Sequence, residues 1–173
     1  MNLNVGEHLR EVLKRRAILL DTNFLSEAAR HTDRFEEFFD ILQSVHAEPA
    51  ITDLIRCEFL AGVHDDELRD ERERFLKDLG VLYIPVHPIV GLVDEAIEVT
   101  NDLCRHKERG TLGLVDELHI TLLKKYQGNL SLVTRNHRDF PTSILVREVV
   151  FAVDIGGQDV AAYGVYSWRG RQP

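Results

Sequence analysis

The apolar and polar residues of this chain are spaced in a way that predicts strands and helices in turn. Four short segments, residues 17–20, 48–52, 81–86 and 130–134, are predicted as strands; the first is a continuous apolar run typical of a buried strand, and the last is mainly apolar. Segments with helical spacing are predicted between them, at residues 23–30, 35–45, 53–58, 64–79, 90–107 and 114–126. Because parallel strands need crossover connections, usually helices, this alternation predicts an α/β fold with a mainly parallel central sheet.

The two ends of the chain depart from this alternation. Apolar residues with helical spacing predict an N-terminal helix over residues 5–15 that packs on the domain. Residues 144–154 and 160–168 are rich in strand-forming residues, and the Gly156-Gly157 pair between them predicts a C-terminal β-hairpin. No repeat, low-complexity segment or linker interrupts residues 1–173, so we expect a single domain.

Length and composition narrow the class of protein. A chain of 173 residues can bury a sizeable core, and its apolar fraction of 44% is ordinary for a globular protein. It contains no apolar stretch near the about 20 residues that cross a bilayer, and its charged N-terminus lacks the apolar region of a signal peptide. Cys57 and Cys104 lack metal-ligand spacing and are expected to be reduced thiols. We therefore expect a cytoplasmic protein without a membrane segment.

The net charge of −8 argues against general electrostatic adhesion to nucleic acid, which needs Lys and Arg to neutralise phosphates. It does not exclude an enzyme that acts on nucleic acid, because a cluster of metal-binding carboxylates lowers the net charge by itself. Local basic groups exist, such as residues 14–16 and 135–138, although any one of them is more often a solvated surface.

Polar side chains follow the first predicted strand at the point where it ends. The apolar run 17–20 is followed at once by Asp21, Thr22 and Asn23. In open α/β sheets ligands bind beyond the carboxyl ends of the strands, so Asp21 is expected at the mouth of a site. Taken alone, an Asp in this place is more often the cap of the next helix.

Further acidic or amide residues stand at comparable places downstream. Glu58 lies on the helix after the second strand, Asp116 lies in the first turn of a later helix, and Asn136 and Asp139 follow the last core strand. Each has a structural explanation by itself: an exposed helix residue, a charge that complements the helix dipole, or an Asx turn. Their joint placement beyond strand ends is what indicates a shared site.

Together these motifs resemble the PIN-domain nucleases, named from the PilT N-terminus, and most closely the VapC-type toxins of bacterial toxin–antitoxin pairs. Leu-Leu-Asp21-Thr-Asn is similar to the opening strand of the family, Glu58-Phe-Leu-Ala-Gly to its second acidic motif, and Leu-Val-Thr134-Arg-Asn136-x-x-Asp139-Phe to its last core motif. Asp116 matches the acidic residue that heads a helix in the family. The resemblance spans about residues 17–149 and implies a three-layer α/β/α fold, with the N-terminal helix and the C-terminal hairpin outside the common core.

Two features depart from the family pattern. Glu117 and His119 stand on the Asp116 helix where small or apolar residues are usual, and Asn136 stands where many relatives have Asp. Asp139 is a possible substitute, so the sequence leaves open whether Asn136 or Asp139 completes the metal site.

The resemblance implies an Mg²⁺- or Mn²⁺-dependent endoribonuclease, because these hard cations prefer oxygen ligands and activate water for phosphodiester hydrolysis. The implied catalytic metal ligands are Asp21, Glu58 and Asp116, completed by Asn136 or Asp139. The residues expected to orient the attacking water or a phosphate are Thr22, Asn23 and Thr134. The residues expected to hold the RNA backbone are Arg135, His137 and Arg138. The resemblance also implies a homodimer and a small antitoxin partner.

Two other functions stay open at this point. One is a PIN-fold interaction module whose site has decayed, which three intact acidic positions argue against and Asn136 slightly favours. The other is a haloacid-dehalogenase-like phosphatase, a class that also begins with an Asp after an apolar strand. That class has Asp-x-Asp, whereas this chain has Asp21-Thr-Asn23, so its general acid would be missing.

Overall fold

Strands and helices alternate along the middle of the chain, as the residue pattern predicts. The computed structural model of the protein describes residues 3–61, 63, 65–86, 91–105, 113–157 and 159–170. The elements are α1 (Leu3–Leu13), β1 (Ala17–Leu20), α2 (Thr22–Arg30), α3 (Thr32–Ser44), β2 (Glu48–Thr52), α4 (Asp53–Ala61), α5 (Asp66–Leu79), β3 (Leu82–Ile84), α6 (Leu92–Arg105), α7 (Leu114–Lys125), β4 (Leu130–Thr134), β5 (Leu145–Gly156) and β6 (Asp159–Trp168).

Six strands form one sheet in the order β3-β2-β1-β4-β6-β5. The strands β3, β2, β1 and β4 are parallel neighbours, and β6 and β5 join antiparallel to β4 and to each other. The mixed α/β fold with a mainly parallel sheet is therefore confirmed.

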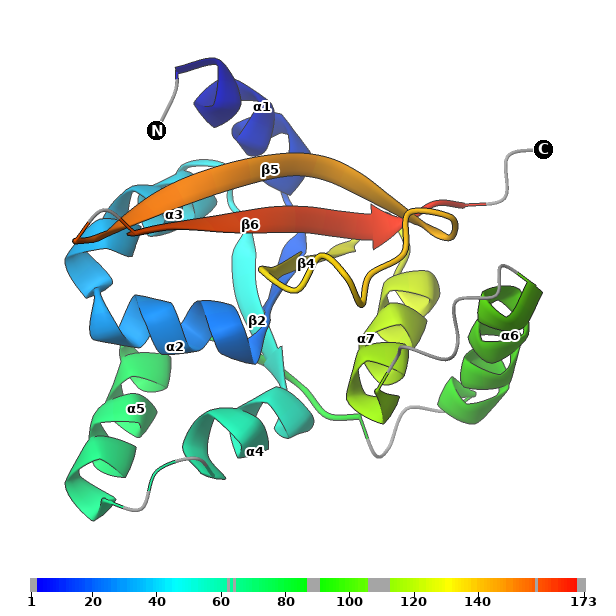
Figure 1. The fold of residues 1–173 in the computed structure, drawn as a ribbon, viewed down its shortest axis with the longest axis horizontal. Coiled ribbons are helices and arrows are strands. Elements are labelled where there is room, and N and C mark those ends of the chain that lie inside the picture. Colours follow the sequence, from blue (N-terminus) through cyan, green and yellow to red (C-terminus); the bar gives the residue numbers. More distant parts are fainter. Residues whose placement is uncertain are drawn as a thin grey trace.

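Helices cover the sheet from two sides because the crossover connections change direction. The chain moves outward from β1 to β2 to β3, then returns past β1 to form β4. Since such crossovers are almost always right-handed, the helices of the outward path and those of the return path belong on opposite faces. In Figure 1, α2, α3 and α5 lie on one side of β1 and β2, and α6 and α7 lie on the other.

The change of direction creates a switch point between β1 and β4, the place where open α/β sheets bind ligands. Leu20 pairs with Val133 at this edge, and the backbone N–H of Asp21 donates to the Val133 carbonyl at 3.1 Å. The parallel register therefore places Asp21 beside Thr134, the last residue of β4.

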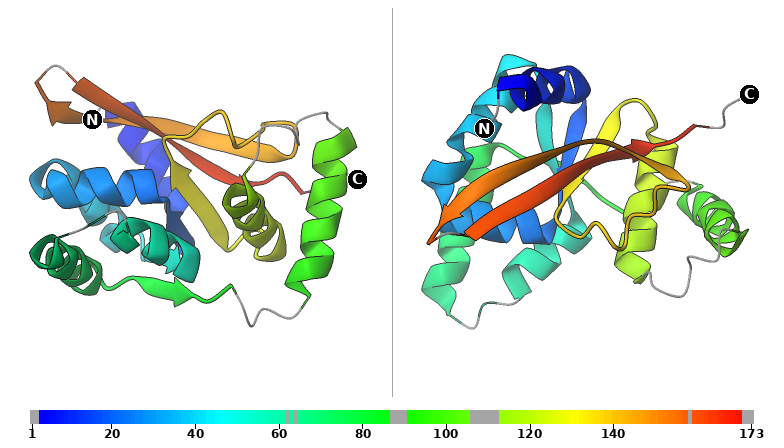
Figure 2. Two further views of the ribbon diagram at one scale, coloured as in Figure 1. Left: turned by 60° about the horizontal axis from the view of Figure 1, so that its bottom comes forward. Right: turned by 45° about the horizontal axis from the view of Figure 1, so that its top comes forward.

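The predicted C-terminal hairpin exists, and it joins the central sheet. Its second strand, β6, pairs with β4 and so extends the central sheet, while α1 and α3 pack against β5. Figure 2 shows the two strands as a long ribbon that reaches beyond β4. Conserved-core boundaries drawn from motifs alone miss this pairing, because it joins segments that are distant in sequence.

Several predicted boundaries need correction. The third strand is limited to β3, which is shorter than residues 81–86, and α1 ends at Leu13, ahead of Arg15, whose φ is +57°. Helix α5 begins at Asp66 because Asp65 caps it, its side chain accepting the Glu67 N–H. Residues 64, 87–90 and 106–107, which the predicted helices and their flanks included, lie outside the described residues.

An aromatic cluster fixes the hairpin to the rest of the core. Phe24 of α2 lies 5.0 Å from Phe35 of α3 and 5.0 Å from Tyr163 of β6, measured between ring centroids. Phe38 of α3 stacks on Phe151 of β5 at 5.1 Å. Such pairs add to the free energy that burial of the rings already supplies, so β5 and β6 are held on the domain by packing as well as by backbone pairing.

Two expectations from composition concern cysteines and membrane segments. Cys57 and Cys104 are both exposed free thiols. No helix within the described ranges has the length and apolar character needed to cross a bilayer.

Candidate active site

Asp21 stands at the start of α2 as its N-terminal cap, with its carboxylate held from three directions. One oxygen accepts the Thr22 backbone N–H at 2.7 Å, and the other accepts the Asn23 amide and the Thr134 hydroxyl, each at 2.5 Å. Burial raises the pKa of Asp21, while these three hydrogen bonds, that of Thr134 first, act in the opposite direction. The helix-cap role and the site role of Asp21 therefore occur together.

Thr134 connects the residues at this end of the sheet. Its hydroxyl donates to Asp21 and accepts from the Asn23 amide at 3.1 Å and from the Asn136 backbone N–H at 2.9 Å. The Asn23 side-chain carbonyl in turn accepts the Arg135 backbone N–H at 3.0 Å. The ends of β1 and β4 are thus locked to each other by a closed set of hydrogen bonds.

Glu58, on the helix α4 that follows β2, lies at the same site. Its carboxylate accepts the Thr22 hydroxyl at 2.7 Å. Thr52, fully buried at the end of β2, caps α4 by accepting the Ile55 N–H at 3.1 Å. The neighbouring Asp53 is used differently: its carboxylate accepts the adjacent Leu54 N–H and the Val86 N–H near β3.

Asp116 is the carboxylate whose protonation is most perturbed. It lies in the first turn of α7, where the backbone N–H of the capping residue Gly113 bonds to it. Burial is the first cause that raises the pKa of Asp116, to about 6, and the charges of Asp139, Asp21 and Glu58 raise it further. The structure thus brings the other three predicted acidic residues, Asp21, Glu58 and Asp139, within electrostatic reach of Asp116.

Asn136 and Asp139 form one unit in the turn after β4. The Asn136 amide N–H donates to the Asp139 carboxylate. Among the neighbouring carboxylates, Asp139 contributes the largest charge effect at Asp116. These contacts favour Asp139 as the oxygen donor that faces the other carboxylates, with Asn136 fixing its orientation.

The three predicted RNA-contacting residues lie in the same turn but differ in their surroundings. Arg135 and Arg138 are exposed, whereas His137 is partly buried. His137 Nδ1 lies 2.8 Å from the hydroxyl of Tyr166, a fully buried residue of β6. The C-terminal hairpin therefore contacts the rim of the site, a relationship that the sequence did not indicate.

His119 is a second residue whose surroundings were not predicted. It lies on α7 one turn after Asp116, is 1% exposed, and its Nε2 lies 3.4 Å from the Thr52 hydroxyl. Its Nδ1 has no hydrogen-bond partner among the described residues. Burial lowers the pKa of His119 to about 4, and the Glu58 charge acts in the opposite direction. The sequence offered two signals for it: its position three residues after Asp116, and its place where the family usually has small or apolar residues.

The carboxylates of the site are the side chains that could hold a divalent metal ion. In the described part of the chain, no group of three or more His, Cys, Asp or Glu side chains is arranged so that it could hold a metal ion as it stands. The reason lies in the contacts above: the Asp21, Glu58 and Asp139 carboxylates are directed at Asn, Thr and backbone donors. Their chemistry nevertheless fits Mg²⁺ or Mn²⁺, because mutually repelling oxygen donors are what such a cation neutralises.

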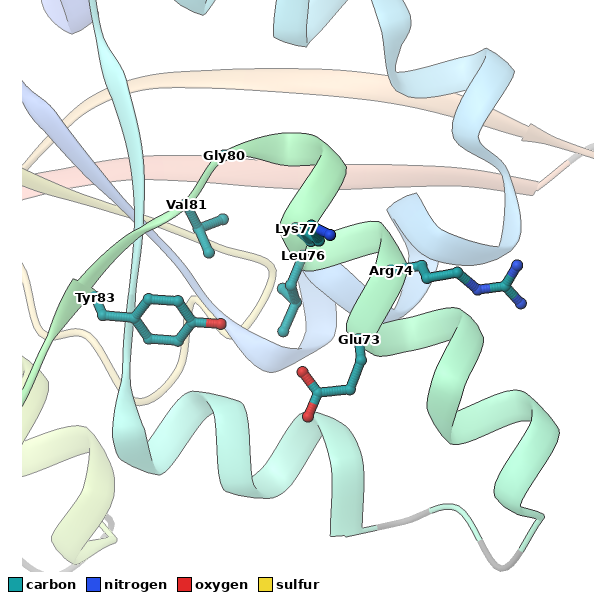
Figure 3. Close-up of a pocket in the computed structure, with 7 residues that line it drawn as sticks. All are labelled: Glu73, Arg74, Leu76, Lys77, Gly80, Val81 and Tyr83. Atoms are coloured by element: carbon teal, nitrogen blue, oxygen red, sulfur yellow. The ribbon is translucent and has the colours of Figure 1, made fainter.

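One hollow of the surface lies away from these residues. A cavity of about 340 Å³ lies between the end of α5 and β3, where Figure 3 shows Tyr83 reaching toward Leu76 and Glu73. Its lining includes none of the predicted site residues, and it borders β3, the outermost strand of the sheet. The switch point between β1 and β4, rather than this cavity, is where the reactive side chains converge.

The PIN domain family matches residues 18–142, which is most of the chain and includes every acidic residue of the site. No curated protein and no solved structure matches this sequence. The chain belongs to the PIN domain family, whose members are generally nucleases. The match ends before β5 and β6, so the hairpin lies outside the part that the family shares.

Proposed function

We propose that this PIN-domain protein is an endoribonuclease that hydrolyses RNA phosphodiester bonds with bound Mg²⁺ or Mn²⁺. One observation carries this proposal: carboxylates from four segments gather at the switch point of the sheet, where burial, and then the charges of Asp139, Asp21 and Glu58, raise the pKa of Asp116 to about 6. A site with this charge needs a cation before it can accept a polyanionic substrate.

The metal would be held by Asp21, Glu58, Asp116 and Asp139. When bound, Mg²⁺ or Mn²⁺ lowers the pKa of a coordinated water and offsets the charge that develops on the phosphate. Thr134 and Asn23 hold Asp21 in one orientation, and Thr22 holds Glu58. The chain therefore supplies oriented oxygen donors, and no Ser-His-Asp nucleophile is required.

The turn after β4 would bind the RNA backbone. Arg135 and Arg138 are exposed beside the site, and their guanidinium groups suit phosphate contacts. His137 completes the set as a hydrogen-bond donor. This local positive charge allows a protein with a net charge of −8 to approach RNA.

The resemblance to VapC-type toxins extends the proposal to a toxin held inactive by a small antitoxin protein, and to a homodimer. The neighbouring gene tests the first extension: a short reading frame that encodes a DNA-binding domain is expected. Sedimentation of the purified protein tests the second.

The two alternatives predict different results in one assay. A phosphatase of the haloacid dehalogenase class is disfavoured because Asn23 donates its amide to Asp21 and provides no general acid. A decayed PIN module would bind partners without cleaving RNA at any metal concentration.

The test is cleavage of labelled structured RNAs by the wild-type protein with Mg²⁺, with Mn²⁺ or with chelator. We expect cleavage with either metal, none with chelator, and a loss of at least about 100-fold in Asp21→Asn, as for removal of a group central to charge stabilisation.

Glu117→Gln is the matched control, because it removes a negative charge next to Asp116 without touching the site. The Glu117 carboxylate instead accepts the Thr100 hydroxyl of α6. The activity of Glu117→Gln should equal that of wild type. Cleavage that survives in chelator or in Asp21→Asn would contradict the proposal.

A further inference from the structure

The strand β6 lies outside the family match, yet it borders the proposed RNA-binding turn. Gly164 pairs with Thr134, and Tyr166 pairs with Leu132, in the antiparallel ladder between β6 and β4. Residues paired across a ladder share a face of the sheet, and residues two apart on one strand also share a face. Gly164 and Tyr166 therefore lie on the face that carries the Thr134 hydroxyl.

Because Gly164 has no side chain, the rings of Tyr166 and His137 can both lie close to its Cα atom. A Cβ atom added at this position would lie 2.6 Å from Tyr166 Cε2 and 3.1 Å from His137 Cε1 and Nδ1. The first distance is shorter than real side-chain contacts allow, and both rings are attached to buried or partly buried residues. The close approach of His137 to β6 thus depends on the absence of a side chain at residue 164.

The Tyr166 hydroxyl then decides which edge of the His137 ring faces outward. Arg147, the register partner of Tyr166 on β5, forms a hydrogen bond with this hydroxyl. A guanidinium can only donate, so the Tyr166 oxygen accepts from Arg147, and its O–H is available to donate to His137 Nδ1, 2.8 Å away. When Nδ1 accepts this O–H, the ring proton of His137 is carried by Nε2.

We propose that Tyr166 and Gly164 are positioning residues that direct the Nε2–H of His137 to a phosphate oxygen of RNA bound across the end of β4. This role rests on the proposed ribonuclease function. It gives the C-terminal hairpin a part in substrate binding, with Arg147 fixing the direction of the Tyr166 O–H.

Tyr163 offers a matched control on the same strand. Both tyrosines are fully buried, but the Tyr163 hydroxyl has no hydrogen-bond partner among the described residues. Tyr163 packs in the aromatic cluster with Phe24, three residues away from Tyr166 and therefore on the other face of the strand. Tyr→Phe at either position keeps the ring and removes one hydroxyl.

The experiment measures KM for RNA and kcat at saturating Mn²⁺ in wild type, Tyr166→Phe, His137→Ala, the double variant and Tyr163→Phe. Loss of one hydrogen bond in Tyr166→Phe should raise KM for RNA about threefold to tenfold with kcat little changed. The double variant should match His137→Ala, because Tyr166 acts through His137, and Tyr163→Phe should match wild type.

Side-chain ¹⁵N–¹H spectra of the histidines provide a readout that does not depend on RNA. Wild type should show His137 with its proton on Nε2, and Tyr166→Phe should lose this preference while Tyr163→Phe keeps it. A Tyr166→Phe variant with wild-type KM, or with an effect that adds fully to that of His137→Ala, would overturn the positioning role alone. A wild-type protein that neither binds nor cleaves RNA would overturn the ribonuclease function together with it.

Discussion

Asp21 and Asp116 belong to the same candidate site, but Asp21 is fixed by three hydrogen bonds, whereas Asp116 is partly buried beside three like charges. Three donors converge on Asp21: two come from the first turn of α2, and the third, Thr134, comes from the end of β4, which the parallel register places beside Asp21. Asp116 has one backbone donor, from Gly113, and its pKa is raised to about 6. The strand side of the site is therefore preorganised without a cation, and the helix side is the part that a cation would relieve.

This difference predicts opposite effects of the same substitution on folding stability. In Asp21→Asn, whichever way the amide is turned, its NH₂ group meets at least one of the donors that now face the carboxylate. In Asp116→Asn the amide oxygen can still accept the Gly113 N–H, and a repelled charge is removed. We expect Asp21→Asn to be less stable than Asp116→Asn by about 3 kcal/mol, with wild type between them.

Urea denaturation of the three proteins in chelator at neutral pH measures this difference. Both variants should also be inactive toward RNA. Asp116→Asn should therefore lose activity while it gains stability, whereas Asp21→Asn should lose both. Equal denaturation midpoints for the two variants would contradict the view that hydrogen bonds stabilise the Asp21 carboxylate while like charges destabilise the Asp116 carboxylate.

The strand side of the site is also the part that the sequence predicts well. The bounds of the second and fourth strands, residues 48–52 and 130–134, agree with the structure, and parallel pairing alone is enough to bring Asp21 to Thr134. Short apolar runs that end in polar residues carry this information locally.

The helix side and the rim could not be predicted in the same way. His119 is three residues from Asp116 in the sequence, but its burial against Thr52 depends on how α7 packs over the end of β2. Likewise, the contact of His137 with Tyr166, which is 29 residues away in the sequence, depends on the pairing of β6 with β4. No local pattern encodes such pairings, because they are decided by which strand fills the free edge of the sheet.

Two titratable groups of α7, the partly buried Asp116 and the buried His119, should give pH dependences of opposite sign. The folded-state pKa of Asp116 is raised from 3.8 to about 6, so the folded protein binds this proton more tightly and loses stability as pH rises through that range. The pKa of His119 is lowered from 6.5 to about 4, so the unfolded chain binds this proton more tightly and stability rises with pH over nearly the same range. In wild type the two contributions oppose each other.

Single variants should expose each contribution. Relative to wild type, Asp116→Asn should gain stability as pH rises from about 4 to about 6, by about 1 kcal/mol after allowance for its partial exposure. His119→Leu should lose stability relative to wild type over the same rise, by about 2 kcal/mol. Melting temperatures in chelator, taken as variant minus wild type at each pH, measure both; difference curves of the same sign would show that one of the two groups is not buried as described.

The smallest expected effect concerns the turn that joins the two sides of the site. Asp139 lies in the turn after β4 and so belongs to the strand side. Its charge nevertheless raises the pKa of Asp116, on the helix side, more than the charge of Asp21 or Glu58 does. Asn136 bonds to Asp139 through its amide N–H and is tied to Thr134 through its backbone.

If Asp139 supplies the oxygen and Asn136 only orients it, Asp139→Asn should raise the half-saturating Mn²⁺ concentration for cleavage about tenfold, and Asn136→Ala about threefold, as expected for a ligand and for a supporting contact. The double variant should resemble Asp139→Asn, because orienting an absent carboxylate has no further effect. Metal titrations of RNA cleavage in the three variants decide between the residues, and a larger shift in Asn136→Ala than in Asp139→Asn would make Asn136 the ligand and Asp139 its support.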